Sequence, residues 1–351
     1  MTNFASLPSS ATHGLAMKPA DPGRPFSVQF LLVEGFSMMA LSAAIEPMRA
    51  ANRLLGRRRY LWTLVGEKAA NMIASNGIEL RVPFSIKDVP SSDMTVVLAS
   101  LSVEEYQNAE VFSWLRTLKR SGRLLGAISN GSLVLARAGV AHNTKLTIHW
   151  EMATQLSESF PDIAVSSDLY CWDKGILTAA GGTAALDMML ALISEMDGAS
   201  LAMDVADQFL HGQIRPSSQF QRQDLQSRFS ITDDRVLAAI EIFERNIASP
   251  TKIAAVASKV GISERQLERL FIAQVDMPPA AFYLHLRLIA ARRMIIASTE
   301  ALEAIAERCG FSSLGHFSRA FKAKFRASPS QLRRHKPHSH DGFVQGTDEA
   351  G

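Results

Sequence analysis

Short apolar runs alternate with longer segments of helical periodicity over the first two thirds of the chain. The predicted strands are residues 26–33, 94–100, 123–129 and the start of 175–196, and the predicted helices are residues 37–55, 103–122 and the end of 175–196. Strands that alternate with helices favour right-handed crossovers and a mostly parallel sheet. The pattern therefore predicts an α/β domain of the open, flavodoxin-like kind.

The pattern changes after residue 210. Residues 212–234 (GQIRPSSQFQRQDLQSRFSITDD) are polar and lack apolar periodicity, and every later segment has the periodicity of a helix. An all-α domain is therefore predicted to follow the α/β domain. The expected boundaries are a flexible segment over 1–25, an α/β domain over 26–210, a linker over 211–230, a helical domain over 231–336 and a flexible tail over 337–351.

Composition describes an ordinary globular chain, with 47% hydrophobic and 20% charged residues. The first 25 residues lack the pattern of a signal peptide, and no stretch reaches the roughly 18 to 20 apolar residues of a membrane span, so we expect no membrane partner and a cytoplasmic location. The cysteines, Cys171 and Cys309, are far apart in the sequence and indicate neither a disulfide framework nor a zinc site. No cofactor or metal is expected.

The net charge of the chain is +3, but the charged residues are distributed unevenly along the sequence. Residues 251–336 contain fifteen Lys or Arg against six Asp or Glu. A basic domain that follows a mildly acidic one indicates a polyanionic partner, usually nucleic acid. A basic, solvated helical surface is the alternative on composition alone.

The helical domain contains an internal repeat. Residues 254–271 (AAVASKVGISERQLERLF) match residues 303–321 (EAIAERCGFSSLGHFSRAF), with Gly261 and Gly310 in register. In each copy a short helix ends at this glycine, and a serine then caps a second helix. In the first copy Ser263 and Gln266 form the S-x-x-Q pattern of a capping box. Each copy therefore has the parts of a helix-turn-helix.

Helical spacing divides each second helix into two faces. Leu267, Leu270 and Phe271 are predicted to face inward in the first copy, as are Phe317, Ala320 and Phe321 in the second. The first turns then face outward, as recognition helices require for contact with base edges in double-stranded DNA. The candidate DNA-binding residues are Ser263, Glu264, Arg265, Gln266, Arg269, Ser312, Ser313, Leu314, His316, Ser318, Arg319 and Lys322.

The segment between the copies, residues 279–298, has the pattern of one long helix. A rigid helix of this kind would fix the distance between the recognition helices, so that they enter successive major grooves on one face of DNA. A helical interaction domain that uses the same repeat as a scaffold is the alternative.

The C-terminal hundred residues closely resemble the AraC/XylS DNA-binding domain, with the second-half signature in residues 305–334 (IAERCGFSSLGHFSRAFKAKFRASPSQLRR). Asp276 and Arg326 depart from the family pattern, which usually has glycine there, and Leu314-Gly315 replace a more polar pair. The N-terminal domain resembles the PfpI-like, class I glutamine amidotransferase-like fold. The combination resembles the GlxA subfamily of AraC regulators over about residues 26–336.

The resemblance to the amidotransferase-like fold places a candidate functional turn at residues 127–131 (AISNG). In that fold a cysteine normally stands on the turn between this strand and the next helix, and a histidine follows later. Here Ser129 takes the turn position and His149 (KLTIHW) falls where the histidine is expected. A hydroxyl is harder to activate than a thiol, because it needs an oriented base and an oxyanion hole. We expect a pocket that has lost its nucleophile.

Two other interpretations of the turn stay open. A serine amidase or hydrolase would use Ser129 and His149, but Ala127 replaces the first glycine of G-x-S-x-G, and no third member is evident among Glu34, Glu46, Asp173 and Asp187. Alternatively, Ser129 is a residue of a tight turn and His149 a packed core group.

A retained pocket is expected at the carboxyl edge of the sheet, where open α/β folds bind ligands. The candidate ligand-binding residues are Glu34, Phe36, Ser129, Asn130, Gly131, His149 and Trp150. Backbone donors at the start of a helix favour a carboxylate, and Trp150 or Trp172 offers a face to a cationic nitrogen. The resemblance implies a small nitrogenous effector such as an amino acid, betaine or a carnitine-like amine.

The sequence thus predicts a DNA-binding transcriptional regulator, an activator by hypothesis, with a non-catalytic ligand-sensing domain. RNA polymerase and a second copy of the chain are its expected protein partners, since a symmetric dimer is the commonest way to present two binding units.

Overall fold

A computed structural model describes residues 24–100, 103–221, 231–297 and 300–334. The chain divides into two compact units, which we call the N-terminal unit (up to Gln221) and the C-terminal unit (from Arg222). The flexible segments expected over 1–25 and 337–351 lie almost entirely outside the described residues, as does the end of the expected linker, residues 222–230.

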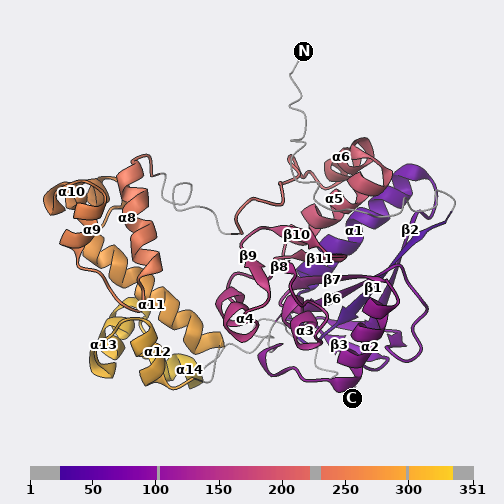
Figure 1. Cartoon of the computed structure of the whole chain (residues 1–351), viewed down its shortest axis with the longest axis horizontal. Helices are drawn as coiled ribbons and strands as arrows, with labels where there is room; N and C mark the ends of the chain where they lie inside the picture. Colours follow the sequence, from indigo (N-terminus) through magenta and orange to yellow (C-terminus); the bar gives the residue numbers. More distant parts are fainter. Residues whose placement is uncertain (1–23, 101–102, 222–230, 298–299, 335–351) are drawn as a thin grey trace, which may run out of the picture. The chain divides into compact units, whose positions relative to one another are not determined.

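The N-terminal unit is built on a seven-stranded sheet in the order β10-β11-β7-β6-β1-β2-β5, in which all pairs are parallel except β10 with β11. The expected parallel α/β architecture is confirmed (Figure 1). The strands of this sheet are β1 (Phe26–Leu32), β2 (Tyr60–Gly66), β5 (Phe84–Ser85), β6 (Met94–Ala99), β7 (Leu124–Ser129), β10 (Tyr170–Asp173) and β11 (Ile176–Ala179).

Smaller elements complete this unit. Two further pairs of strands are β3 (Ala70–Ile73) with β4 (Glu79–Val82), and β8 (Lys145–Thr147) with β9 (Ala164–Ser166). The helices are α1 (Met38–Leu55), the 3₁₀ turn η1 (Val103–Glu105), α2 (Ala109–Arg120), α3 (Gly131–Arg137), α4 (Ala153–Ser159), α5 (Ala184–Asp197) and α6 (Ala199–Gln208).

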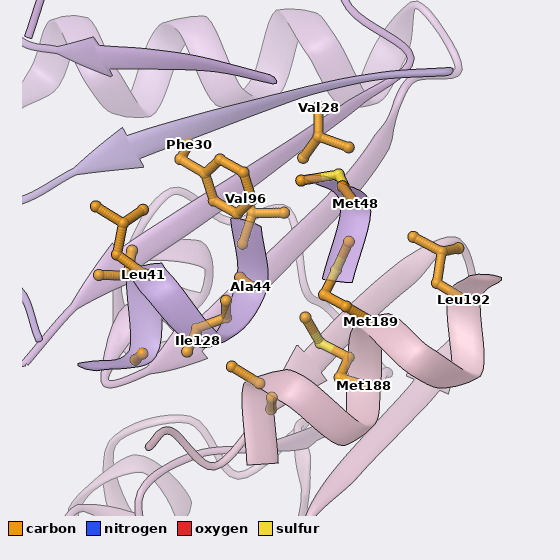
Figure 2. Close-up of a cluster of buried hydrophobic side chains, with 14 of the residues drawn as sticks. Val28, Phe30, Leu41, Ala44, Met48, Val96, Ile128, Met188, Met189 and Leu192 are labelled. Carbon is orange, nitrogen blue, oxygen red and sulfur yellow. The ribbon is translucent and has the colours of Figure 1, made fainter. Parts of the chain in front are cut away.

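The sheet is buried on both faces. Along β1, Phe30 and Leu32 pack with α1, α5 and α6, whereas Leu31 belongs to the core beneath α2 and α3. Figure 2 shows the first core, where Val28, Phe30 and Val96 of the sheet meet Leu41, Ala44 and Met48 of α1 and Met188, Met189 and Leu192 of α5. Strands covered on both sides read as continuous apolar runs, which is why β1, β6 and β7 were visible in the sequence.

The C-terminal unit is entirely helical over its described residues. Its two cores are arranged in tandem: one surrounds Phe243, Phe271 and Phe282, and the other surrounds Phe317 and Phe321. The long helix α11 supplies residues to both cores, as its predicted connecting role requires (Figure 1). The helices are α8 (Asp234–Arg245), α9 (Ile253–Lys259), α10 (Glu264–Val275), α11 (Pro279–Ala297), α12 (Leu302–Arg308), α13 (Leu314–Phe325) and α14 (Pro329–Arg334).

Candidate functional sites

The first helix-turn-helix consists of α9, a turn at Gly261 and α10. Gly261 has a φ of 76°, the left-handed conformation that ends a helix. Ser263 then caps α10: its Oγ accepts from the Gln266 N–H at 3.3 Å, and Gln266 Oε1 accepts from the Ser263 N–H at 3.0 Å. The predicted capping box is present, and it fixes where α10 begins.

The second helix-turn-helix repeats this plan with α12, Gly310 and α13. Gly310 has a φ of 73°, and the Oγ of Ser313 accepts from the His316 N–H at 3.3 Å. Leu267 and Phe271 of α10 and Phe317 and Phe321 of α13 are fully buried. The inward faces of both second helices are therefore as the repeat predicts.

Most of the candidate DNA-binding side chains are exposed on the outward faces. Leu314 is half-buried against the second core, and Ser318 is also half-buried. The exposed candidates are Ser263, Glu264, Arg265, Gln266, Arg269, Ser312, Ser313, His316, Arg319 and Lys322.

Arg287 of α11 fastens the second turn. Its Nε donates to the Cys309 carbonyl at 2.8 Å, its Nη2 donates to the Gly310 carbonyl at 2.6 Å, and its guanidinium lies 4.2 Å from the centre of the Phe311 ring. The carbonyls that end α12 thereby receive donors from the connecting helix. The long helix holds the second turn through polar contacts as well as apolar packing.

At the other candidate site, Ser129 ends β7 with a φ of 59° and is 5% exposed. Glycines surround this elbow. A Cβ built on Gly181, in the loop after β11, would lie 2.9 Å from the Ser129 Cβ, and one built on Gly131 would collide with the Val97 carbonyl. The backbone approaches closely from two sides, so Ser129 is held in a strained conformation of the kind found at functional turns.

Asn130 follows Ser129 and is 9% exposed. Its backbone N–H donates to the Ala99 carbonyl at the end of β6, at 2.9 Å, so this backbone donor is already used. Its side-chain Nδ2 donates to the Ser100 carbonyl at 2.6 Å, whereas Oδ1 is buried and has no hydrogen-bond partner. Since a carbonyl only accepts, the amide orientation is fixed and Oδ1 is an acceptor without a donor.

His149 and Trp150 follow β8, with ring centroids 5.3 Å apart. Burial lowers the pKa of His149, although Glu151, 3.7 Å from Nδ1, raises it in part. No hydrogen bond joins Ser129 to His149 in the part of the chain that the structure describes. Within the described residues, Ser129 is therefore not paired with His149 as the serine of a hydrolase is paired with its base.

The acids considered for a triad are engaged elsewhere. Glu34 Oε1 accepts from the Ile73 N–H, and Glu46 pairs with Arg49. Asp173 Oδ2 accepts from the Lys145 N–H, and Asp187 binds two side chains of the segment after α6. Phe36, a candidate ligand-binding residue, is fully buried in the core beneath α1.

Neither cysteine has the properties of a nucleophile. Both thiols are free and buried. Burial raises the pKa of Cys171, and it raises the pKa of Cys309 to about 11. Both sulfurs therefore remain protonated near neutral pH.

Known protein families match the N-terminal and the C-terminal parts of the chain separately. Residues 27–195 match the DJ-1/PfpI family, and residues 256–335 match a helix-turn-helix domain. The chain is 36% identical over 304 residues to the HTH-type transcriptional regulator CdhR of Pseudomonas aeruginosa, covering 87% of this chain and 90% of CdhR. It is also 36% identical over 308 residues to the HTH-type transcriptional regulator GlxA of Rhizobium meliloti, covering 88% of this chain and 95% of GlxA.

The chain belongs to the GlxA-type AraC family of transcriptional regulators. A solved AraC family transcriptional regulator from Pseudomonas putida is similar to part of this chain, with 28% sequence identity and a TM-score of 0.50. The match covers 53% of this regulator and 100% of the solved chain. The relatives that match most of its length are named transcriptional regulators and not enzymes, which favours the regulator interpretation over the hydrolase interpretation.

Sequence reasoning missed a polar segment of the regulator that we call the strap, residues 211–221. Its composition suggested a linker, yet it is hydrogen-bonded to the N-terminal unit at both ends. Arg215 Nη2 donates to the fully buried Asp187 at 2.6 Å, and Gln221 Nε2 donates to the Ile148 carbonyl at 2.9 Å. The one feature of the sequence that could have predicted this contact is Asp187, an aspartate inside the apolar helix α5, because a buried charge needs a partner.

Two hollows on the N-terminal unit of the regulator lie beside α2 rather than at the elbow. One, of about 430 Å³, is lined by Trp114 and Arg123 among others. The other, of about 320 Å³, is lined by Lys119, Arg120 and His142 among others. Neither includes Ser129, His149 or Trp150.

Within the described residues, no helix is both long and apolar enough to span a bilayer. The same residues contain no group of three or more His, Cys, Asp or Glu side chains arranged to hold a metal ion.

Proposed function

We propose that this regulator binds a small nitrogenous effector at the elbow of its N-terminal unit and so controls transcription through its C-terminal unit. The observation that carries the proposal is the pairing of a strained, buried Ser129 with the unpartnered Asn130 Oδ1 beside it. Strained residues and unsatisfied buried acceptors are costly and concentrate at functional sites. Relatives that are regulators give such a site a sensing role rather than a catalytic one.

The effector site consists of Ser129, Asn130 and Gly131 on the elbow, with His149 and Trp150 beside it. Glu34 contributes from the loop after β1, and Phe36 supports that loop from the core. Trp150 is half-buried and offers an aromatic face to a cationic nitrogen.

In the C-terminal unit, the exposed first turns of α10 and α13 enter successive major grooves of double-stranded DNA. Arg265 is the proposed base-reading residue of α10, and Lys322 of α13 contacts phosphate. The regulator acts in the cytoplasm as an activator and a homodimer, with RNA polymerase as a partner, because two copies present paired binding units to two half-sites.

Substitution of Ser129 tests the effector site. In titration calorimetry with amino acids, glycine betaine and carnitine, Ser129→Ala is expected to weaken the binding of the effector by about 0.5–1.5 kcal/mol, the net value of one hydrogen bond. DNA binding without effector should be unchanged. Ser129→Trp should abolish the response, because Gly181 leaves no room for a large side chain.

Ser129→Gly is the matched control, since it removes the same hydroxyl but relieves the left-handed strain. The alanine and glycine variants should lose effector affinity alike while differing in melting temperature. Unchanged affinity in both variants would remove Ser129 from the site.

A further inference from the structure

The strap is anchored at its start by a buried charge. Asp187 is fully buried in α5 and accepts from Arg215 Nε at 2.9 Å, from Arg215 Nη2 at 2.6 Å and from the Arg215 N–H at 2.9 Å. His211 Nε2 lies 2.8 Å from the same carboxylate. Breaking such a buried pair leaves an uncompensated charge, so this end of the strap is held firmly.

The strap then runs beside β10 and the loop before it. The Leu169 N–H donates to the Ser217 carbonyl at 2.9 Å, and the Leu169 carbonyl accepts from the Ala180 N–H at 2.8 Å. Ala180 precedes Gly181, the glycine that contacts Ser129. One residue of backbone therefore separates the strap from the loop that covers the elbow.

Gln221 ends the strap with a side chain whose orientation is fixed. Its Nε2 has two N–H groups and three acceptors within reach: the Ile148 carbonyl at 2.9 Å, Thr147 Oγ1 at 2.9 Å and the Asp168 carbonyl at 3.2 Å. Two of these partners are carbonyls, which only accept, so the amide nitrogen must face them. Gln221 Oε1 is then a buried acceptor, and it has no hydrogen-bond partner.

Gln221 Oε1 and Asn130 Oδ1 thus share one chemical property. Both are buried amide oxygens that lack a donor. Asn130 is on the elbow, and Gln221 is bonded to Ile148, the neighbour of His149, which the effector site includes. Buried acceptors in folded proteins are nearly always satisfied, so each of these oxygens favours a bound group that donates.

We propose that the effector is an amine that carries N–H bonds, and that Gln221 Oε1 accepts one of them. This inference rests on the effector site proposed above and specifies its ligand class. A quaternary ammonium group has no N–H to donate, so betaine and carnitine leave both acceptors unsatisfied. Gln221 also directly precedes Arg222, the first residue of the C-terminal unit. A hydrogen bond between Gln221 and the effector would therefore lie next to the segment that connects the two units.

Pairs of ligands that differ only in N-methylation test the ligand class on the full chain. We would titrate a panel of α- and ω-amino acids and their N-trimethyl counterparts, including glycine with glycine betaine and 4-amino-3-hydroxybutyrate with carnitine. For the pair that binds best, the N–H form should bind about 10- to 100-fold more tightly, the range for hydrogen bonds to a charged group. Equal or tighter binding of the trimethyl form would overturn the inference and leave the effector site standing. Binding of no amine would overturn both.

Gln221→Leu tests the assigned residue, with Gln219→Leu as the matched control because the Gln219 side chain is exposed on the same strap. Gln221→Leu should reduce the preference for the N–H form over the trimethyl form by about tenfold or more, and Gln219→Leu should leave it unchanged. Gln221→Met, which also lacks the acceptor but keeps an unbranched side chain of similar length, should show the same reduction and covers the case in which the leucine variant fails to fold. An unchanged preference in folded Gln221→Leu or Gln221→Met would overturn the assignment.

Discussion

Residues other than glycine adopt the left-handed backbone conformation at the elbow and at the ends of α10 and α13. Asp276 and Arg326, which stand where the family usually has glycine, have φ values of 56° and 61° and end α10 and α13. These two residues therefore adopt the left-handed conformation that glycine would adopt, at the free-energy cost that this conformation has for residues with a Cβ. Ser129 has the same conformation at the elbow, where Gly181 lies directly against its side chain.

At the same scale, His149 should make the stability of the N-terminal unit depend on pH. Burial lowers its pKa, so the native state binds a proton less readily than the unfolded chain does. Stability is complete above the ordinary histidine pKa of about 6.5 and is lost as the pH falls below it. The melting temperature, followed by tryptophan fluorescence, should therefore fall from pH 7.5 to pH 5.5, and less so in His149→Gln.

His142→Gln is the control for that measurement, because His142 is exposed and pairs with Asp162 instead of facing the core. All four tryptophans precede residue 173, so the fluorescence reports on the N-terminal unit. A pH dependence that is the same in His149→Gln and in the parent would show that another group is responsible.

At the scale of elements, the two helix-turn-helix copies have diverged in their surroundings. Gly261 and Gly310 have nearly the same φ, but a Cβ on Gly261 would meet nothing within 4 Å. A Cβ on Gly310 would lie 2.6 Å from the Ile247 carbonyl and in collision with Pro250. The second turn is packed against the loop between α8 and α9, whereas the first is open.

Alanine at the two glycines should therefore have unequal effects. Gly261→Ala is expected to destabilise the C-terminal unit by about 1–2 kcal/mol, the cost of a left-handed alanine. Gly310→Ala should add about 1–3 kcal/mol for overpacking. Denaturant unfolding followed by helical circular dichroism would measure both; equal losses would mean that the Ile247–Pro250 loop moves aside freely.

At the scale of the whole molecule, each unit has its own core, and the chain between them is polar. The basic excess of residues 251–336 belongs to the C-terminal unit alone. The basic charge that favours DNA binding therefore lies in one unit, and we expect affinity for DNA to be a property of that unit.

A fragment that starts at Ile231 should bind duplex DNA by itself. Because Lys and Arg displace counterions condensed on the phosphates, its affinity should fall steeply with salt, by a slope of about 0.9 per phosphate contact in a log–log plot. Lys322→Ala should reduce that slope by about one, and residues 1–221 should not bind. Fluorescence anisotropy with a random duplex is sufficient; binding that ignores salt would contradict the electrostatic account.

The sequence by itself determined the features that rest on local periodicity. The buried strands β1, β6 and β7, the long helix α11 and both capped turns follow from spacing within one segment, because side-chain direction repeats every 2 or 3.6 residues. Ser129 was located in the same way, since a strand, a turn and a helix are consecutive in the chain. The strand β2 was missed because most of its residues are exposed or half-buried, and β8 was missed because it is only three residues long.

Tertiary structure alone decided which distant polar groups meet. A hydrogen bond depends on two atoms at about 3 Å. Asp187 and Arg215 are 28 positions apart in the sequence, and Ile148 and Gln221 are 73 positions apart, and separations of this length leave no periodic pattern. The polar strap was for that reason indistinguishable from a linker in the sequence. The unpartnered oxygens of Asn130 and Gln221 are visible only once every neighbour has been placed, because a missing donor is a property of the folded surroundings rather than of the residue.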